Sequence, residues 1–132
     1  MRIYLAGPIF QCEDHECIDW REEAKAKLDG FEVIDPMERD YRGVTDENHK
    51  NIVEDDKTLI DSCDVLLVNH LKPSVGNSME ILYAWERDKK VYLICEDGEV
   101  SPWLLYHATR IFKSQRDALT YIKTEGINAN AQ

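Results

Sequence analysis

The chain has 132 residues, 43% of them hydrophobic and 32% charged, which suits one domain with a single hydrophobic core. Its 16 basic and 26 acidic residues give a formal net charge of -10, which argues against binding to DNA, RNA or anionic membranes, although local donors can still hold a small anion. No apolar run approaches the roughly 18 residues of a membrane span. The apolar start is too short for a signal peptide, so we expect a cytoplasmic protein.

Strands and helices are expected to alternate along the chain. In order, the pattern predicts a strand over residues 2–6, a helix over 16–28, a strand over 31–34, a helix over 45–62, a strand over 65–69, a helix over 78–88, strands over 91–95 and 110–112, and a helix over 115–124. The polar loop over residues 35–45 is long for a compact domain, and loops of that length are often functional.

The predicted strands are near-continuous apolar runs, which is typical of a parallel sheet covered on both faces by helices. Right-handed crossovers favour an α/β fold of the flavodoxin-like, or Rossmann-like, kind with the strand order 2-1-3-4-5. Ligands then bind at the carboxyl ends of strands one and three. We expect residues 1–126 to form a single domain and residues 127–132 to form a disordered tail.

One carboxylate stands out behind the third predicted strand. Glu80 falls in the first turn of the helix predicted from residue 78, just past the carboxyl end of a central strand. An acid in that position gains from the helix dipole, tends to stay ionised and is a potential nucleophile. The alternative is that Glu80 only stabilises its helix.

Two other side chains are expected at the same edge of the sheet. Tyr4 is near the end of the first strand, and Asp56 is on the helix face that also carries Val53 and Ile60. An acid on an apolar face is costly unless it is paired or used. Two carboxylates beside a phenol suit glycosyl chemistry, in which one attacks the anomeric carbon and the other assists the leaving group. Each residue alone has a structural explanation, but their convergence favours function.

The four cysteines give no firm metal site. Cys63 and Cys95 are in or beside apolar strands and are expected to be reduced core residues. Cys12, His15 and Cys17 offer three possible ligands, but their spacing fits no zinc template and no fourth ligand is evident. We therefore favour a polar loop there.

Three motifs together resemble the nucleoside 2-deoxyribosyltransferase family over nearly the whole chain. They are the opening from Ile3 to Pro8, the spacing Asp56-x7-Asp64, and the block Gly76-x3-Glu80-x3-Ala84. The resemblance implies that Glu80 attacks C1′ of a 2′-deoxynucleoside to form a covalent deoxyribosyl-enzyme. It also implies that Asp56 is near the departing base, that Tyr4 orients Glu80, that the protein is a homodimer or higher homo-oligomer, and that no cofactor or metal is needed.

The sequence departs from this family at two positions. Many members have an aspartate where this chain has Ser74, whereas the family's N-glycosidases of (deoxy)nucleoside 5′-monophosphates have a phosphate-binding serine there. A hydroxyl followed by a glycine turn and a helix N-terminus also suits an anion on physical grounds. Those hydrolases have another serine where this chain has Pro8, which offers neither a hydroxyl nor an N–H. Ser74 therefore favours a nucleotide, and Pro8 opposes it.

The expected substrate contacts are Gly7, Pro8, Ser74, Gly76, Asn77 and, supplied by the partner subunit, Ser101. Residues 37–42 are expected to close over the base, with Tyr41 and Arg42 as candidate contacts. The sequence leaves open whether water or a second base takes the sugar. A non-catalytic nucleotide-binding or sensing domain is the alternative. A phospho-receiver domain is rejected because no acidic residue follows the first strand. An NAD-cleaving glycohydrolase is not favoured, because the sequence has no G-x-G-x-x-G loop for a dinucleotide.

Overall fold

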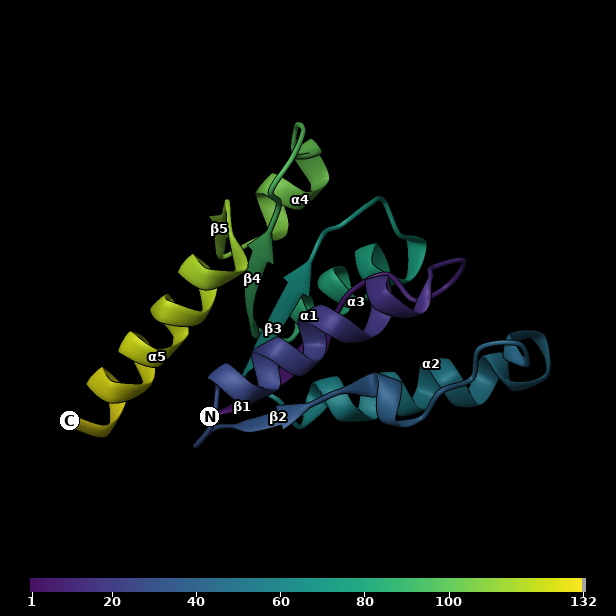
Figure 1. The fold of residues 1–132 in the computed structure, drawn as a ribbon, viewed down its shortest axis with the longest axis horizontal. Helices are drawn as coiled ribbons and strands as arrows, with labels where there is room; N and C mark the ends of the chain where they lie inside the picture. Colours follow the sequence, from purple (N-terminus) through teal and green to yellow (C-terminus); the bar gives the residue numbers. More distant parts are fainter. Residues whose placement is uncertain (132) are drawn as a thin grey trace.

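The described part of the chain contains one parallel sheet of five strands. The computed structural model describes the backbone of residues 1–131 and the side chains of residues 1–126. The strands are β1 (Arg2–Ala6), β2 (Glu32–Ile34), β3 (Val65–Asn69), β4 (Lys90–Ile94) and β5 (Arg110–Phe112). They pair in the order β2-β1-β3-β4-β5 (Figure 1), which confirms the predicted flavodoxin-like α/β architecture.

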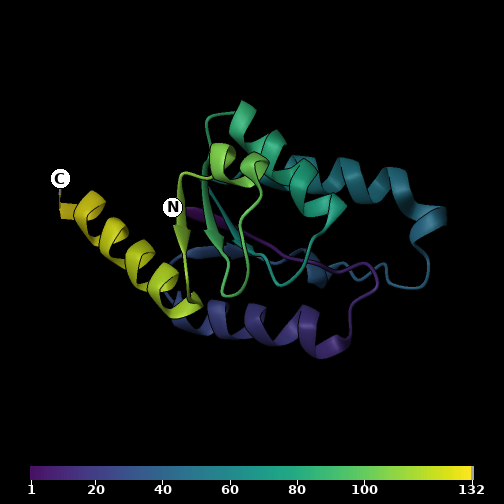
Figure 2. The same cartoon turned by 90° about the horizontal axis from the view of Figure 1, so that it is seen from above.

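Helices cover both faces of this sheet. α1 (Asp14–Lys27) and α5 (Gln115–Ala131) lie on one face, and α2 (Thr45–Asp61), α3 (Val75–Glu86) and α4 (Pro102–His107) lie on the other (Figure 2). A short 3-10 helix, η1 (Pro36–Glu38), follows β2. Successive strand side chains point to opposite faces. Ile3 and Leu5 therefore enter the core under α1 and α5, whereas Tyr4 and Ala6 enter the core under α2, α3 and α4.

The start of α3 differs from the prediction. The helix begins at Val75 instead of residue 78, because Ser74 caps it: the Ser74 hydroxyl oxygen accepts a hydrogen bond from the Asn77 N–H at 3.3 Å. Serine is among the strongest N-cap residues. Gly76, which suggests a loop in the sequence, lies inside the first turn. This shift moves Glu80 away from the helix end.

The last helix also differs, because α5 continues through Gly126 to Ala131. A Cβ at position 126 would lie 2.7 Å from the ring of Phe31, so this glycine allows a close approach to the neighbouring side chain and does not end the helix. Residues 127–131 therefore continue α5 where the sequence predicts a disordered tail. Gln132 lies outside the described residues.

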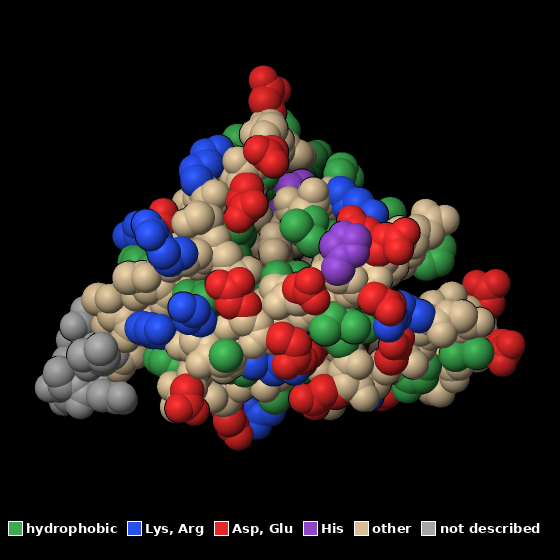
Figure 3. Space-filling view, viewed as in Figure 1, with side chains coloured by type: hydrophobic (Ala, Val, Ile, Leu, Met, Phe, Trp, Pro, Cys, Tyr) green, Lys and Arg blue, Asp and Glu red, His purple; other side chains and the backbone are tan. Residues whose placement is uncertain are grey.

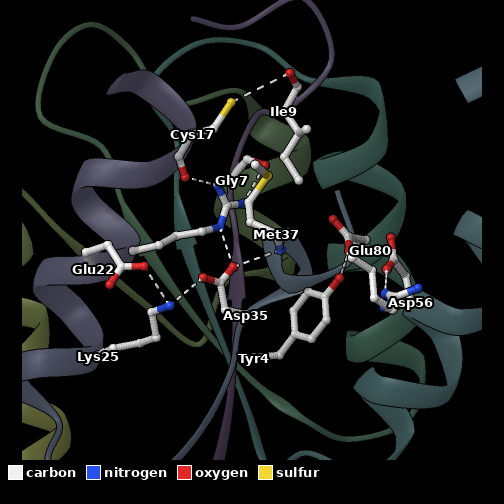
Figure 4. Close-up of polar contacts among 12 residues, drawn as sticks. Tyr4, Gly7, Ile9, Cys17, Glu22, Lys25, Asp35, Met37, Asp56 and Glu80 are labelled. Carbon is white, nitrogen blue, oxygen red and sulfur yellow. Dashed lines mark hydrogen bonds and ion pairs between the residues drawn. The ribbon is translucent and has the colours of Figure 1, made fainter. Parts of the chain in front are cut away.

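A buried arginine ties together the loops at the carboxyl ends of β1 and β2. Arg21 on α1 is fully buried, and its guanidinium donates to the carbonyl oxygens of Cys17 at 2.6 Å and Gly7 at 3.0 Å (Figure 4). Its Nε is 3.5 Å from Oδ1 of Asp35, whose other oxygen is 2.9 Å from Nζ of Lys25. Breaking a buried pair leaves an uncompensated charge, so these segments are held in fixed positions.

Packing explains why residue 7 is a glycine. A Cβ at this position would lie 2.6 Å from Cζ2 of Trp20, a distance that side-chain carbons do not reach without displacement. Trp20 is 7% exposed and belongs to the core under α1, so the indole has little room to move. The loop after β1 therefore depends on glycine for its approach to α1.

We expect Gly7→Ala to lower the free energy of unfolding by about 1–3 kcal/mol, because the added methyl overpacks against Trp20. Urea unfolding at neutral pH measures the change. Gly76→Ala is the matched control: nothing lies within 4 Å of a Cβ there, and alanine favours a helical turn by up to about 1 kcal/mol. Equal losses in the two variants would contradict this explanation of Gly7.

Candidate active site

A cavity of about 580 Å³ lies where β1, β2 and β3 end. Its walls come from the loop after β1, residues 36–47, α2 and the start of α3. Of the residues predicted from the sequence, those that line it are Gly7, Asp56, Ser74, Gly76, Asn77 and Glu80. The cavity therefore coincides with the ligand crevice that the fold predicts at this edge of the sheet.

Tyr4 reaches this cavity through Glu80. The tyrosine is fully buried on β1, and its hydroxyl donates to Oε2 of Glu80 at 2.7 Å (Figure 4). Burial and the nearby carboxylates raise the pKa of the Tyr4 phenol, so it remains a donor. The two residues are 76 positions apart in sequence, and the fold brings them together as predicted.

The environment of Glu80 differs from the sequence-based expectation. Because α3 starts at Val75, no acidic residue lies in its first turn, and Glu80 lies in the second. The helix dipole acts mainly within the first turn, so it stabilises the ionised form less than expected. Burial raises the pKa of Glu80 to about 7, against the opposing hydrogen bond from Tyr4. Near neutral pH the protonated form of Glu80 is therefore more favoured than the helix-dipole argument predicts.

Asp56 faces the same cavity from α2. Its Oδ1 accepts a hydrogen bond from Nη2 of Arg39 at 2.7 Å, and Nη1 of Arg39 donates to Oδ2 of Asp55 at 3.0 Å. Burial raises the pKa of Asp56, and the hydrogen bond from Arg39 opposes that shift. Asp56 is thus paired and not merely a solvated member of an acidic run.

The inward face of α2 carries a slightly different set of residues from the one predicted. Ile52 lines the cavity and Ile60 is buried, so Ile52, Asp56 and Ile60 share a face at a spacing of four residues. Val53, expected on the same apolar face as Asp56 and Ile60, is 48% exposed and so is not buried as that expectation implies.

Arg39 is a cavity residue that was not predicted from the sequence. It lies just after η1 in the polar loop, and it lines the cavity together with Tyr41 and Arg42, the two candidate base contacts. The length of this loop was the only sequence signal for function there. Its pairing with Asp56, 17 residues away, depends on how the loop folds back onto α2.

The N-terminus of α3 forms another wall. Ser74 uses its hydroxyl oxygen to cap the helix, which leaves the hydroxyl proton free to donate. Asn77 is 3% exposed, and its Nδ2 has no hydrogen-bond partner among the described residues. Free N–H groups at a helix start favour an anion. Ser74, Gly76 and Asn77 therefore form a polar wall suited to a negatively charged group.

Pro8 and Ser101, by contrast, do not line the cavity. Pro8 is buried after β1. Ser101 caps α4, where its oxygen accepts a hydrogen bond from the Trp103 N–H at 3.2 Å. Its predicted contact from the partner subunit remains a prediction.

Within the described residues, no group of three His, Cys, Asp or Glu side chains is arranged to hold a metal ion, and Cys17 is buried with its thiol 3.8 Å from the Ile9 carbonyl. Cys63 and Cys95 are free and buried in the core, as expected.

No helix in residues 1–131 has the length and apolar character to cross a bilayer. Acidic side chains are spread over the face seen in Figure 3, in keeping with the net charge of -10.

The geometry of the site agrees with a comparison of the sequence with known families. A sequence model of one family, described as nucleoside 2-deoxyribosyltransferase, matches residues 3–127. The chain belongs to this family. The resemblance carried by the motifs around Tyr4, Asp56 and Glu80 is thereby confirmed at the level of the family. A search of curated protein sequences gives no match.

Several solved structures share the fold of this deoxyribosyltransferase-family chain. The CMP N-glycosidase BcmB of Clostridium botulinum is 20% identical, with 93% of this chain and 99% of that chain covered and a TM-score of 0.62. A 2-deoxyribosyltransferase of Bacillus psychrosaccharolyticus is 21% identical, with 90% of each chain covered and a TM-score of 0.72. A conserved protein of Enterococcus faecalis V583 is 19% identical, with 94% of this chain and 98% of that chain covered and a TM-score of 0.76.

We expect Glu80→Gln to stabilise the fold, and increasingly so as the pH rises from about 4.5 to 7. The pKa of Glu80 rises from 4.5 to about 7 on folding, so ionisation at higher pH disfavours the folded state, a penalty that glutamine lacks. Thermal unfolding of both proteins across this pH range measures the difference. Glu23→Gln, at an exposed position on α1, is the control that should follow the wild type. A pH-independent difference would contradict the burial of charge at Glu80.

Proposed function

We propose that this protein cleaves the N-glycosidic bond of a 2′-deoxynucleoside or its 5′-monophosphate. The observation that carries the proposal is the 2.7 Å hydrogen bond from Tyr4 to Glu80 at a cavity that Asp56 also lines. A carboxylate oriented by a phenol, with a second carboxylate lining the same cavity, has the composition of a glycosyl-transfer site. Membership of the nucleoside 2-deoxyribosyltransferase family supports this substrate class.

Glu80 is the nucleophile in this mechanism. Tyr4 binds Oε2, which leaves Oε1 to attack C1′ of the sugar. The C1′–N bond breaks with its electron pair going to the base, which takes up a proton from the solvent as it leaves while Asp56 steers it through a hydrogen bond, and a covalent deoxyribosyl–Glu80 ester remains. Water or a second base then attacks C1′ and releases Glu80. Two displacements at one carbon give overall retention of configuration.

Both fates of the sugar are represented among similar structures. One is a CMP N-glycosidase, which suggests hydrolysis of a nucleotide, and another is a 2-deoxyribosyltransferase, which suggests transfer between bases. The wall formed by Ser74, Gly76 and Asn77 favours a 5′-phosphate. Pro8 does not line the cavity, so its missing donor does not count against a phosphate at Ser74.

We also propose that the protein is a cytoplasmic homodimer or higher homo-oligomer. Large apolar side chains are exposed along α3 and α4: Val75, Met79, Leu82 and Trp85 on the first helix, and Trp103, Leu105 and Tyr106 on the second. Exposed apolar side chains gathered on adjacent helices are typical of subunit interfaces. Ser101 begins α4 at the edge of this surface, which supports its contact with the site of a partner subunit.

A chromatographic assay of free base release tests the proposal. The purified protein is incubated with deoxynucleosides and their 5′-monophosphates, with and without a second base. We expect release of base by the wild type and a loss of at least about 10³-fold in Glu80→Ala, because the nucleophile is gone. The wild-type rate should fall below pH 7, since Glu80 must be ionised to attack and its pKa is about 7.

Full base-release activity in Glu80→Ala would overturn the assignment of Glu80 as the nucleophile. Failure of the wild type on every substrate would instead favour a binding domain without turnover. Glu86→Ala, at the far end of α3, is the control and should behave as the wild type.

Replacing Ser74 tests whether this residue binds the 5′-phosphate of the substrate. We expect Ser74→Ala to lower kcat/KM about tenfold for a 5′-monophosphate and much less for the unphosphorylated nucleoside, since a hydrogen bond to a charged group contributes about 1.5–3 kcal/mol. Ser74→Asp separates this effect from the loss of the helix cap, because aspartate also caps but repels phosphate. It should therefore impair the monophosphate further and spare the nucleoside. Equal losses on both substrates would remove the phosphate role.

A further inference from the structure

Arg39 belongs to an ion-pair cluster in the cavity wall, and it has no part in the mechanism above. Arg39 donates one hydrogen bond to Oδ1 of Asp56 at 2.7 Å and another to Oδ2 of Asp55 at 3.0 Å. Its partners are consecutive residues on α2, while Arg39 belongs to the loop after β2. The side chains of Arg39 and Asp56 are 30% and 23% exposed, so the pair is partly shielded from water. Shielding makes a charge pair more effective than one on the open surface.

We propose that Arg39 is a positioning residue that holds the Asp56 carboxylate against the cavity and leaves its second oxygen to the departing base. The inference rests on the proposed glycosidic-bond cleavage. The planar guanidinium engages one oxygen from each of two neighbouring carboxylates, which fixes their orientation as a point charge does not. Because Arg39 binds Oδ1 of Asp56, the other carboxylate oxygen, Oδ2, is not engaged by the guanidinium.

Glu80 and Asp56 thus receive their orientation from two different parts of the fold. Tyr4, from the sheet, binds one oxygen of Glu80, and Arg39, from the loop, binds one oxygen of Asp56. In each case one carboxylate oxygen is held by this partner, and the other is not bonded to it. A displacement of about 1 Å in such a group is enough to cost about a hundredfold in rate.

The charge of Arg39 also acts on the protonation of Asp56. The ionisable groups that face Asp56 are Tyr4 from β1, Arg39 from the loop, Asp55 from α2 and Glu80 from α3. Burial raises the pKa of Asp56, and Arg39 is the cation that opposes this shift. Without Arg39, the carboxylate keeps its burial and the like charge of Asp55 but has no cation to oppose them, so its pKa must rise.

The test replaces Arg39 and follows Asp56 directly. Carbon-13 NMR of the aspartate carboxyl groups is recorded across the pH range without substrate, and Asp56→Asn identifies the signal of Asp56. In Arg39→Gln we expect the Asp56 titration to move upward by roughly one pH unit or more. We also expect kcat/KM for base release to fall by roughly 10- to 100-fold, with the pH limb that disappears in Asp56→Asn moving in the same direction.

Two matched variants separate positioning from a merely structural latch. Arg39→Lys keeps the positive charge but loses the planar guanidinium that binds both carboxylates. It should therefore hold the Asp56 titration near its wild-type pH, with a kcat/KM between those of Arg39→Gln and the wild type. Arg42→Gln removes an arginine from the same loop with a similar exposure, 28%, but that arginine pairs with Asp40 and Asp14. It should leave the Asp56 titration unmoved. Thermal unfolding confirms that each variant is folded.

The outcomes distinguish this inference from the proposed function. An active wild type in which Arg39→Gln leaves both the Asp56 titration and the pH limb in place overturns the role of Arg39 alone. A wild type that releases no base overturns the proposed function and, with it, the role of Arg39 toward a base. A shifted titration together with a shifted pH limb and reduced kcat/KM supports the inference.

Discussion

The site depends on one buried charge, the guanidinium of Arg21. It binds the carbonyl of Gly7 after β1 and approaches Asp35 after β2, so two walls of the cavity are anchored to α1 through one side chain. Burial lowers the pKa of Arg21, and Asp35 opposes that shift, which keeps the group charged and paired. The same loop holds Gln11 with φ of +60°, a left-handed conformation that costs a non-glycine residue about 1 kcal/mol or more.

Within this rigid frame, the burial of Glu80 has a cost that stability alone does not justify. The carboxylate is in the second turn of α3, beyond the main effect of the helix dipole, and its only hydrogen bond from a side chain in the described chain comes from the neutral Tyr4. A protein selected only for stability would replace such a group by an uncharged one. Glu80 is therefore better explained as a reactive group than as a helix-stabilising acid.

The sequence predicted the sheet because apolar strand runs and helical periodicity are local signals that survive folding. It also predicted that Tyr4, Asp56 and Glu80 share one edge, since strand order dictates which loops meet. It did not predict Arg39, because a partner 17 residues away in a loop has no periodicity to reveal it. It misplaced the start of α3, since Gly76 suggests a loop while the cap at Ser74 is decisive.

The partners of the two carboxylates support the proposal that Glu80, and not Asp56, is the nucleophile. Asp56 is bonded to a cation, which draws electron density from its oxygens and lowers their basicity, whereas Glu80 is bonded to a phenol that carries no charge. A carboxylate bonded to a neutral donor keeps more of its basicity, so it is the stronger nucleophile once it is ionised. A carboxylate held by a cation is a weaker nucleophile, and its orientation is fixed for a hydrogen bond with the base. The difference in charge between Tyr4 and Arg39 therefore supports the proposal that Glu80 forms the bond to the sugar and Asp56 contacts the base.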